Sequence, residues 1–339
     1  MASQLISFAT CNLYNLNLPG KPVYTDADGW TEEQYNAKIS WLGRSLATMQ
    51  ADVFGFQELW HGDALDEVLA QAQLEETYTP LVPPDHDGGR IVCAGAVRSD
   101  LLVGEPEWIE TFPPDFRLES QGDDPQTPAI AVHIDSFSRP VLHFTIQPVA
   151  DQAQINVYVV HFKSKSPTQI YREDWYEAAS YSRHSENIGS ALSTIRRTAE
   201  AAAFRMLLVD KMRDTDEPVV VLGDINDATL SNTANILTGQ PNYLFGRSMG
   251  GGDVDLYTVQ TLQQYRSTRD VYYTHIFQNE RESLDHILVS QEFYDNSRKR
   301  IWAFESMDIA NDHLNTDDHK ESGTTDHGII RAVFKLDPA

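Results

Sequence analysis

The stretch that decides the fold is Val219-Val220-Val221-Leu222-Gly223-Asp224-Ile225-Asn226. Its first half is a short apolar run of β-branched residues, which predicts a fully buried strand. The strand ends in a glycine and an aspartate, and an asparagine follows two residues later. A rigid strand end holds a polar side chain in a defined position. This stretch therefore predicts a buried sheet whose edge carries Asp224 and Asn226.

The same pattern, an apolar run with a polar, ligand-type residue at one end, recurs along the chain. A single carboxylate or histidine at a strand end is usually a turn residue, a cap or a structural hydrogen-bonding group. Six such coincidences favour one shared site instead. The other five are Asn12 after 5–10, Glu58 after 53–56, His161 after 157–160, Asp285 with His286 at the start of 287–289, and Asp326 with His327 before 329–330.

These residue types suit a divalent cation and a phosphate. A hard cation prefers oxygen ligands, and Glu58 can supply a carboxylate and Asn12 a neutral oxygen. Phosphoryl transfer also needs a proton acceptor and donors for the phosphorus oxygens, roles that His161 and His327 can fill. A carboxylate such as Asp285 can fix the orientation of a histidine. We expect Mg²⁺ or Mn²⁺, with Ca²⁺ as a further option; Zn²⁺ is disfavoured because the chain has no HExxH or CxxC motif.

Six motifs in the chain resemble the endonuclease/exonuclease/phosphatase superfamily, in the order in which that superfamily carries them. They are Phe8-Ala9-Thr10-Cys11-Asn12, Phe56-Gln57-Glu58, Val160-His161-Phe162-Lys163-Ser164-Lys165, Leu222-Gly223-Asp224-Ile225-Asn226-Asp227, Ser283-Leu284-Asp285-His286-Ile287 and Thr325-Asp326-His327-Gly328. The resemblance implies an α/β fold, a four-layer α/β/β/α sandwich with two packed mixed β-sheets and the site at the sheet ends.

The resemblance also implies roles for these residues. Glu58 would hold the metal with Asn12 close by, and Asp326 would lie next to the metal or support the base. Asp224 and Asn226 would orient the attacking water and contact phosphate. His327, oriented by Asp285, would be a general base or a phosphate ligand, and His161 would bind phosphate or help the leaving group. Members of the superfamily differ in the base, so Asp224 and His327 both stay candidates.

Basic residues after His161 are candidates for binding the substrate phosphate. Lys163 and Lys165 alternate along an expected strand, so at most one should face the site. Arg196 and Arg197 resemble a pair that opens a helix in bacterial relatives, and a helix N-terminus favours anions. An ordinary solvated position is equally compatible with these arginines. His275 is a weaker candidate, and His313 and His319 are interpreted as surface residues.

We expect one catalytic domain over residues 1–339, with 162–190 and 311–325 as loop insertions. Helices are predicted from Thr31, through a capping box with Gln34, and from about Ser190 to Met212. Further strands are predicted at 91–97, 129–134, 141–146, 155–160, 271–277, 284–289, 300–304 and 329–334. Cys11 and Cys93 lie in apolar stretches and are expected to be buried free thiols.

The net charge is −24, from 26 basic and 50 acidic residues. Such a charge repels polyanions and indicates no stable nucleic-acid partner, so small or organic phosphodiesters are favoured over duplex DNA. A nuclease, a phosphomonoesterase, a sphingomyelinase-like lipid phosphodiesterase and an inactive binding module are the alternatives. No signal peptide or membrane span is recognisable, which favours the cytoplasm and leaves secretion of a precursor open. The substrate would be a phosphate ester, and the oligomeric state is not predicted.

Overall fold

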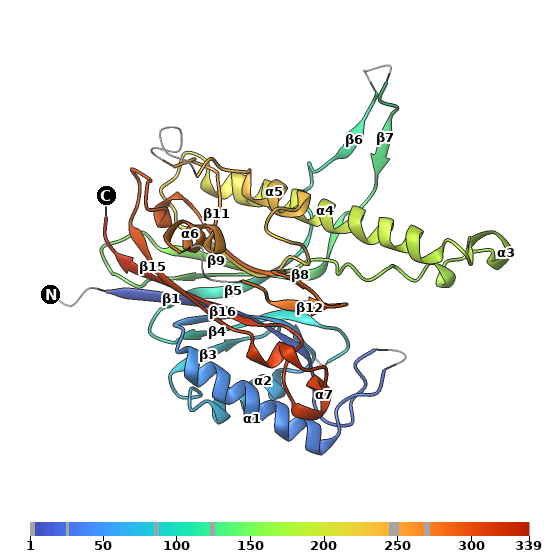
Figure 1. Cartoon of the computed structure of the whole chain (residues 1–339). Coiled ribbons are helices and arrows are strands. Elements are labelled where there is room, and N and C mark those ends of the chain that lie inside the picture. The colour runs from blue at the N-terminus through green and yellow to red at the C-terminus, as the bar shows by residue number, and fades with distance from the viewer. Residues whose placement is uncertain are drawn as a thin grey trace.

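Two six-stranded β-sheets form the centre of the protein (Figure 1). The computed structural model describes residues 4–24, 27–84, 86, 88–122, 126–243, 251–267 and 272–338. The first sheet contains, in spatial order, β15 (Trp302–Ala310), β16 (Ile329–Leu336), β1 (Leu5–Leu16), β2 (Val53–Leu59), β4 (Val92–Arg98) and β3 (Tyr78–Leu81). The second contains β11 (Tyr257–Thr258), β14 (Asp285–Val289), β10 (Val219–Asp224), β9 (Ile155–His161), β8 (Ser136–Ile146) and β5 (Leu102–Thr111).

Each sheet has one parallel pair of strands at its centre and antiparallel strands on both sides. The parallel pairs are β1 with β2 and β9 with β10. Strands β14 and β16 run antiparallel to β10 and β1, so they begin at the edge where their partners end. The register places Asp224 opposite both His161 and Asp285. Polar side chains can therefore be placed at one edge, where β1, β2, β9 and β10 end and β14 and β16 begin.

Apolar side chains fill three layers. One core lies between the two sheets and includes Phe8, Val157 and Val159. A second core packs the first sheet against α1 (Glu32–Met49) and α2 (Gly62–Gln71). A third packs the second sheet against α4 (Ser185–Met212) and α5 (Asn232–Thr238). This is the predicted four-layer α/β/β/α sandwich, so the predicted fold class is confirmed.

Two local predictions, a helix start and the state of the cysteines, are confirmed. Thr31 accepts a hydrogen bond from the backbone N–H of Gln34, whose side chain bonds back to Thr31, and this capping box starts α1. Cys11 and Cys93 are buried free thiols. In the described ranges, no helix is long and apolar enough to cross a lipid bilayer.

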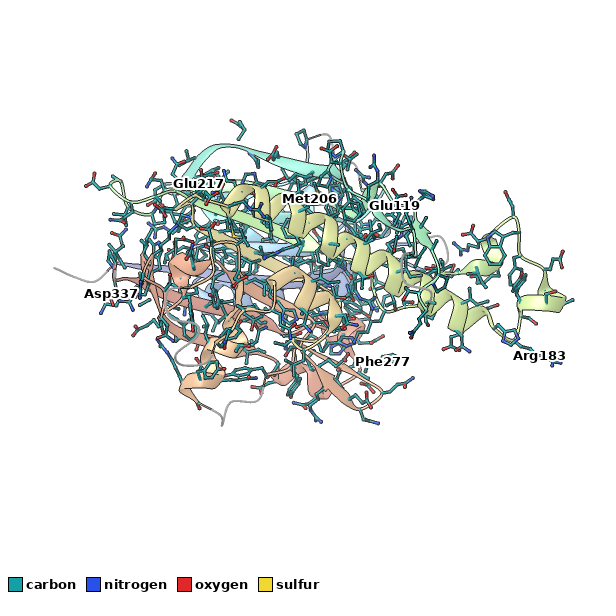
Figure 2. The ribbon with its side chains drawn as sticks, turned by 90° about the horizontal axis from the view of Figure 1, so that it is seen from above. Glu119, Arg183, Met206, Glu217, Phe277 and Asp337 are labelled. Atoms are coloured by element: carbon teal, nitrogen blue, oxygen red, sulfur yellow. The ribbon has the colours of Figure 1, made fainter. Side chains whose placement is uncertain are left out.

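Other local predictions were wrong. The helix predicted from Ser190 begins at Ser185, and its first turns project from the body towards Arg183 (Figure 2). Residues 129–134 do not form a core strand: β7 (Ile130–Val132) pairs only with β6 (Leu118–Ser120) in a protruding arm. Their apolar character resembles a core strand, yet Ile130 is 60% exposed. Strand β5 was missed because its position at a sheet edge leaves an irregular, partly polar pattern.

The remaining elements are short. The segment 162–190 contains η1 (Ile170–Arg172) and α3 (Ala178–Tyr181), and 311–325 contains η3 (Asp312–Asn315) and α7 (His319–Ser322), so neither is wholly loop. The strand expected at 271–277 is β12 (His275–Phe277), which pairs with β13 (Glu280–Glu282); Val271 lies outside the described residues. The strand expected at 300–304 is β15. The others are α6 (Val259–Arg266) and η2 (Gln291–Phe293).

Candidate active site

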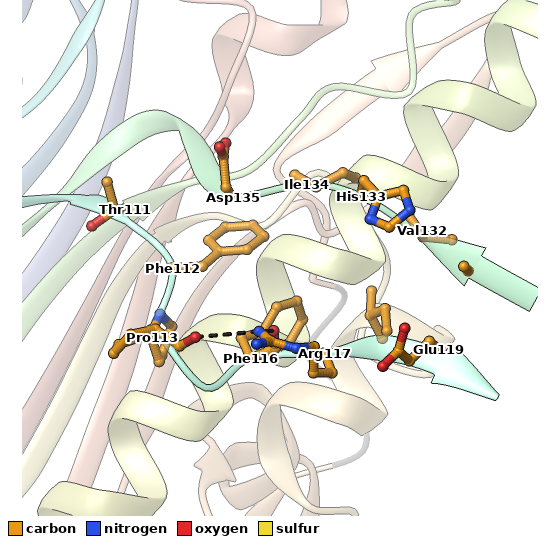
Figure 3. A pocket seen from close by; sticks show the side chains of 13 residues that line it. Thr111, Phe112, Pro113, Phe116, Arg117, Glu119, Val132, His133, Ile134 and Asp135 are labelled. Carbon is orange, nitrogen blue, oxygen red and sulfur yellow. Dashed lines mark hydrogen bonds between the residues drawn. The ribbon is translucent and has the colours of Figure 1, made fainter. Parts of the chain in front are cut away.

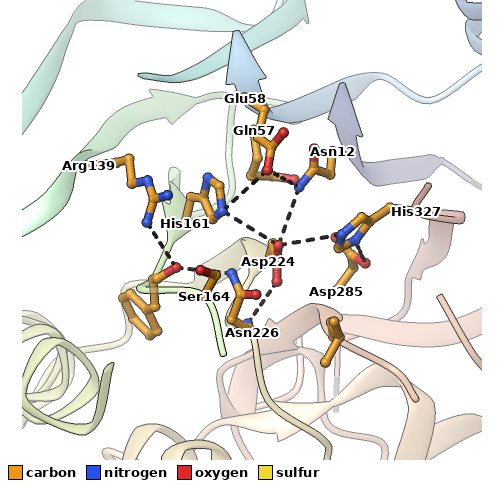
Figure 4. Close-up of polar contacts among 12 residues, drawn as sticks. Asn12, Gln57, Glu58, Arg139, His161, Ser164, Asp224, Asn226, Asp285 and His327 are labelled. Atoms are coloured by element: carbon orange, nitrogen blue, oxygen red, sulfur yellow. Dashed lines mark hydrogen bonds and ion pairs between the residues drawn. The ribbon is translucent and has the colours of Figure 1, made fainter. Parts of the chain in front are cut away.

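Polar side chains from both sheets converge at the edge where the parallel strands end (Figure 4). Asn12 on β1 donates to Glu58 Oε1 at 3.2 Å and to Asp224 Oδ2 at 3.3 Å, so one amide joins the two sheets. His161 Nε2 lies 3.6 Å from Asp224 Oδ2 and 3.9 Å from Glu58 Oε1. His327 Nε2 lies 4.0 Å from Asp224 Oδ2. The predicted groups therefore surround one point.

The backbone bends at Glu58 to aim its carboxylate at this point. Glu58 has φ +61°, a left-handed conformation that non-glycine residues adopt mainly under structural constraint, and the pairing of β2 shifts its register on both sides there. The backbone N–H of Asn15 donates to Glu58 Oε2 at 3.0 Å. Burial and the nearby Asp326 carboxylate raise the pKa of Glu58. A cation bound here would stabilise the Glu58 carboxylate and so lower its pKa again.

Asp224 occupies the centre of the site because the chain can approach its neighbour closely at Gly223. A Cβ atom at Gly223, where φ is +146°, would lie 2.0 Å from the carbonyl oxygen of Val160 on the adjacent parallel strand. Asn226 fixes the carboxylate by donating its backbone N–H to Asp224 Oδ1 at 2.7 Å. Burial, followed by the charge of Asp285, raises the pKa of Asp224 to about 7. Asp224 can therefore exchange a proton near neutrality.

His327 is held by the Asp285 carboxylate. The Nδ1 atom of His327 lies 2.7 Å from Asp285 Oδ2, which leaves Nε2 facing Asp224. Burial by itself lowers the pKa of His327, but the charge of Asp285 and its hydrogen bond outweigh burial and raise the pKa well above its ordinary value. This shift favours the imidazolium form when no cation is bound. An imidazolium can donate to phosphate but cannot accept a proton from water.

The pKa of the second imidazole in the site, that of His161, is shifted in the opposite direction. Burial, together with the nearby charge of Arg139, lowers the pKa of His161 well below its ordinary value. His161 is therefore neutral and can offer either a lone pair or an N–H group. Its Nδ1 atom is buried without a hydrogen-bond partner in the described part of the chain.

The carboxylates fit a divalent cation better than the predicted amide does. Asp326 Oδ1 is buried and has no hydrogen-bond partner among the described residues, and the charge of Asp326 raises the pKa of Glu58. Glu58 and Asp326 thus present carboxylate oxygens that form no ion pair with a lysine or an arginine among the described residues, and a hard cation prefers such oxygen ligands. The Asn12 oxygen, predicted as a metal ligand, accepts the backbone N–H of Tyr14 at 2.9 Å and keeps a second lone pair. In this arrangement Asn12 orients Glu58 and Asp224.

The family model for the endonuclease/exonuclease/phosphatase family matches residues 9–327. The chain belongs to this family. Its members hydrolyse phosphate esters and generally use a divalent metal. Because the match covers nearly the whole chain, it includes every residue of the cluster described above.

Solved structures with the same fold cover almost all of both chains. The human Nocturnin catalytic domain with bound sulfate is 15% identical, over 98% of this chain and 95% of Nocturnin, with a TM-score of 0.55. ANGEL2, a 2′,3′-cyclic phosphatase in complex with adenosine-2′,3′-vanadate, is 13% identical over 98% and 96%, with a TM-score of 0.57. D. rerio TDP2 with a single-strand DNA product is 15% identical over 97% and 98%, with a TM-score of 0.53. At such identities the likeness shows the fold alone. No curated protein sequence matches this chain.

Not all of the basic residues predicted to bind phosphate are placed to do so in this endonuclease/exonuclease/phosphatase domain. Arg197 lies in the middle of α4, so the prediction that it opens a helix was wrong. It is buried, and its Nη1 donates to the carbonyl oxygens of Lys163 and Ser164 at 3.2 and 3.4 Å. Arg197 therefore holds the chain after β9. Arg196 is half-buried and makes no hydrogen bond or ion pair to the described residues.

The two lysines lie beyond the strand, because β9 ends at His161, so they do not alternate along it as predicted. Lys163 Nζ donates to Ser164 Oγ at 3.1 Å, and burial lowers the pKa of Lys163 to about 8. Lys165 Nζ is paired with Glu282 at 2.7 Å and lies 3.8 Å from Asp227, so these two carboxylates already neutralise its charge. Lys163 is therefore the better placed of the two.

Arg139 is a site residue that the sequence analysis missed. It extends from β8 towards His161, and its Nη1 donates to the Phe162 carbonyl at 3.4 Å (Figure 4). Among the described residues, no carboxylate pairs with this arginine. Its charge lowers the pKa of both Glu58 and His161. The buried Glu200 on α4 fixes its surroundings by accepting the backbone N–H groups of Ser138 and Lys163, each at 2.7 Å. An isolated Ser-Arg-Pro sequence gives no signal for this role.

Lys38 is a second residue that the sequence analysis missed. It is fully buried on α1, its Nζ donates to the Thr324 carbonyl at 3.3 Å, and it lies 4.5 Å from the centre of the Trp30 ring. Burial lowers the pKa of Lys38 to about 7. Lys38 thus holds the turn that carries Asp326. On the sequence it resembles an ordinary solvated helix charge.

Three other histidines differ in their surroundings. His275 on β12 lies beside His327, with 5.0 Å between ring centres. His313 and His319 were predicted as surface residues, but both are half-buried: His313 Nε2 bonds to the His327 carbonyl at 2.9 Å, and His319 Nδ1 to Thr324 Oγ1 at 2.8 Å. They pack behind the 324–327 turn and support it.

A cavity of about 620 Å³ lies elsewhere, at the base of the β6–β7 arm (Figure 3). Residues 111–114, 116–119 and 131–135 line it, and Phe112 and Phe116 make edge contact there. None of the predicted site residues lines this cavity. The predicted site residues are therefore concentrated in the polar cluster of Figure 4 and not in this cavity.

Proposed function

We propose that this protein hydrolyses phosphodiesters with the help of a divalent cation, and that small or organic diesters are better substrates than duplex DNA. The observation that carries the proposal is the convergence of His161 and His327 within 4.0 Å of one carboxylate oxygen of Asp224. A neutral imidazole, an imidazolium and a carboxylate that titrates near neutrality provide the groups that water attack on phosphorus needs.

The cation would be held by Glu58 and Asp326. When bound, it would neutralise charge on the phosphate oxygens. Mg²⁺ or Mn²⁺ suits these oxygen ligands, and both ions generally complete their coordination with water and substrate oxygens. The orphaned Asp326 Oδ1 and the raised pKa of Glu58 support this position.

Asp224 is the general base in this mechanism. A water oxygen forms a bond to phosphorus, the ester P–O bond breaks, and the water proton passes to Asp224 Oδ2. Asn226 holds the other oxygen, Oδ1, and so leaves Oδ2 facing the reacting groups. His327 is already protonated, which makes it a proton donor to the departing oxygen or a hydrogen-bond donor to phosphate. Of the two alternatives left open by the sequence, the proposal therefore takes Asp224 and not His327 as the base.

Arg139 and Lys163 bind the substrate phosphate in this scheme. Arg139 is a charged donor beside the site with no carboxylate partner in the described ranges. An arginine presents its N–H groups in a fork that matches phosphate oxygens. This proposal replaces Arg196 and Arg197, which the helix position does not favour.

The preference for small or organic diesters follows from charge. With a net charge of −24, long-range electrostatics disfavour a polyanion, whereas a single phosphate group needs only the local cations. Two of the similar structures support diester chemistry more broadly: ANGEL2 is a 2′,3′-cyclic phosphatase, and TDP2 was solved with a single-strand DNA product.

A substrate screen with the Mg²⁺ concentration held fixed tests the proposal. We expect bis(p-nitrophenyl) phosphate to be hydrolysed faster than p-nitrophenyl phosphate and plasmid DNA to be cut slowly at physiological salt. Asp224→Ala and His327→Ala should each lower turnover by a factor on the order of 10² or more. Turnover within twofold of wild type in both variants would reject the site. A preference for plasmid or for the monoester would reject the substrate class.

A further inference from the structure

The residues next to His275 in the chain hold it against the turn 324–327, which carries Asp326 and His327. Thr274 accepts the backbone N–H of Gly328 at 2.7 Å through its carbonyl, and its hydroxyl oxygen accepts the N–H groups of Leu284 and Asp285 at 2.9 and 3.1 Å. His275 forms an isolated β-bridge with His327. Two segments that carry catalytic side chains therefore fix the position of His275, as expected for a residue that takes part in a site.

Three potential ligand atoms meet at this bridge. One ligand atom each from His275, Asp326 and His327 lies within 4.8 Å of the other two. The His275 imidazole has no hydrogen-bond partner among the described residues, and Asp326 Oδ1 is buried without one. Because Nδ1 of His327 is bonded to Asp285, its free ligand atom is Nε2. A carboxylate that fixes the ring of a histidine through its other nitrogen is the usual environment of a metal-bound imidazole.

We infer that His275, Asp326 and His327 form a second cation site, which takes a borderline transition metal such as Zn²⁺ beside the cation held by Glu58. Two imidazole nitrogens favour such an ion over Mg²⁺, and three protein ligands leave a coordination position open. A carboxylate has two oxygens, so Asp326 can contact both cations. The inference rests on the proposed function, because it adds an ion to the same site.

A metal on Nε2 would replace the proton of the imidazolium, so a positive charge would remain next to Asp224. His327 would then no longer donate to phosphate or to the departing oxygen, and the second ion would supply the positive charge in its place. The expectation from sequence motifs, that the absence of HExxH and CxxC disfavours zinc, does not consider ligands that only the fold brings together. His275 and His327 are 52 positions apart and meet through the β-bridge.

Calorimetric titration of the chelator-stripped full chain with Zn²⁺ in excess Mg²⁺ tests the inference. We expect wild type to bind one Zn²⁺ per chain. His275→Ala should weaken this binding by at least about tenfold, since even outer-shell changes weaken metal binding by that much. His133→Ala is the matched control, because His133 is an exposed histidine at the base of the β6–β7 arm. It should bind Zn²⁺ as wild type does.

Wild type that binds no Zn²⁺ in excess Mg²⁺, or a His275→Ala variant that binds it like wild type, would overturn the second site. Diester hydrolysis by wild type with Mg²⁺ alone is measured separately. Hydrolysis without Zn²⁺ binding retains the proposed function and rejects only the second site. Zn²⁺ binding that depends on His275, without hydrolysis in any metal, supports the second site and rejects the proposed function.

Discussion

The Nδ1 atom of His327 lies 2.7 Å from Oδ2 of Asp285, a residue 42 positions earlier in the chain. Asp285 is fully buried at the start of β14, and its backbone N–H is bonded to Thr274. The carboxylate therefore cannot turn away from the imidazole. This pair fixes which nitrogen of His327 faces Asp224, and it keeps the ring charged.

Asp285→Asn should lower kcat for a diester by a factor on the order of 10², because an amide neither stabilises the imidazolium nor fixes the ring in the same way. Steady-state kinetics with saturating Mg²⁺ measures the change. Asp308→Asn is the control, since Asp308 is an exposed carboxylate paired with Arg331, and it should retain wild-type kcat. Equal rates for the two variants would show that the buried pair does not support turnover.

Asp224→Asn should stabilise the metal-free protein, and more so at high pH. Burial raises the pKa of Asp224 from 3.8 to about 7, so the folded state retains a proton that the unfolded chain has lost. The stability that this protonated group contributes is complete below pH 3.8 and is lost as the pH rises to about 7. An asparagine carries no such charge.

Thermal unfolding in the presence of a chelator, followed from about pH 5 to about pH 8, measures this difference. The gap in Tm between Asp224→Asn and wild type should widen up to about pH 7 and then level off. Asp308→Asn, on the surface, should show no such trend. A gap that is constant with pH would mean that the Asp224 carboxyl group has an ordinary pKa.

Arg139→Ala should lower kcat/KM by about 10- to 100-fold, the loss expected for one charge-assisted hydrogen bond to phosphate. Its melting temperature should stay close to that of wild type, because within the described part of the chain the guanidinium makes a single long hydrogen bond, to the Phe162 carbonyl. Kinetics with a small diester and a thermal melt of the same preparation give both quantities. An unchanged kcat/KM would remove Arg139 from the site.

Arg197→Ala should show the reverse pattern. Removing this buried guanidinium leaves the carbonyls of Lys163 and Ser164 without their donor, at a cost of about 1–3 kcal/mol in unfolding free energy. Denaturant unfolding measures this cost. If Arg197→Ala instead unfolded like wild type and raised KM strongly, Arg197 would contact substrate as the sequence had suggested.

Exhaustive chelation should abolish hydrolysis of bis(p-nitrophenyl) phosphate, and added Mg²⁺ or Mn²⁺ should restore it. The reason is that the charge of Asp326 raises the pKa of Glu58, and neither carboxylate forms an ion pair with a lysine or an arginine among the described residues. Glu58→Gln should need a higher Mg²⁺ concentration for half-maximal rate. Full activity after chelation would contradict a metal-assisted mechanism.

The sequence alone determined the fold class and the central candidate residues. The sequence shows these candidates because each polar residue directly follows a short apolar run that predicts a buried strand. The residues are Asn12, Glu58, His161 and Asp224. The 190–212 helix and the 129–134 strand were less well predicted. Both segments extend beyond the sheets, and part of their apolar surface is exposed to solvent. The sequence pattern does not distinguish such exposed apolar residues from residues of a buried core.

Tertiary structure decided the rest, because electrostatics and ligation depend on distances between segments far apart in sequence. Only the fold shows that Arg139 reaches the site while Arg197 supports it from behind. Burial beside Asp285 raises the pKa of Asp224 to about 7, and this burial exists only in the folded chain. Likewise, only the β-bridge to His327 brings His275 to the turn 324–327. Sequence specified the chemical groups, and packing specified their charges and partners.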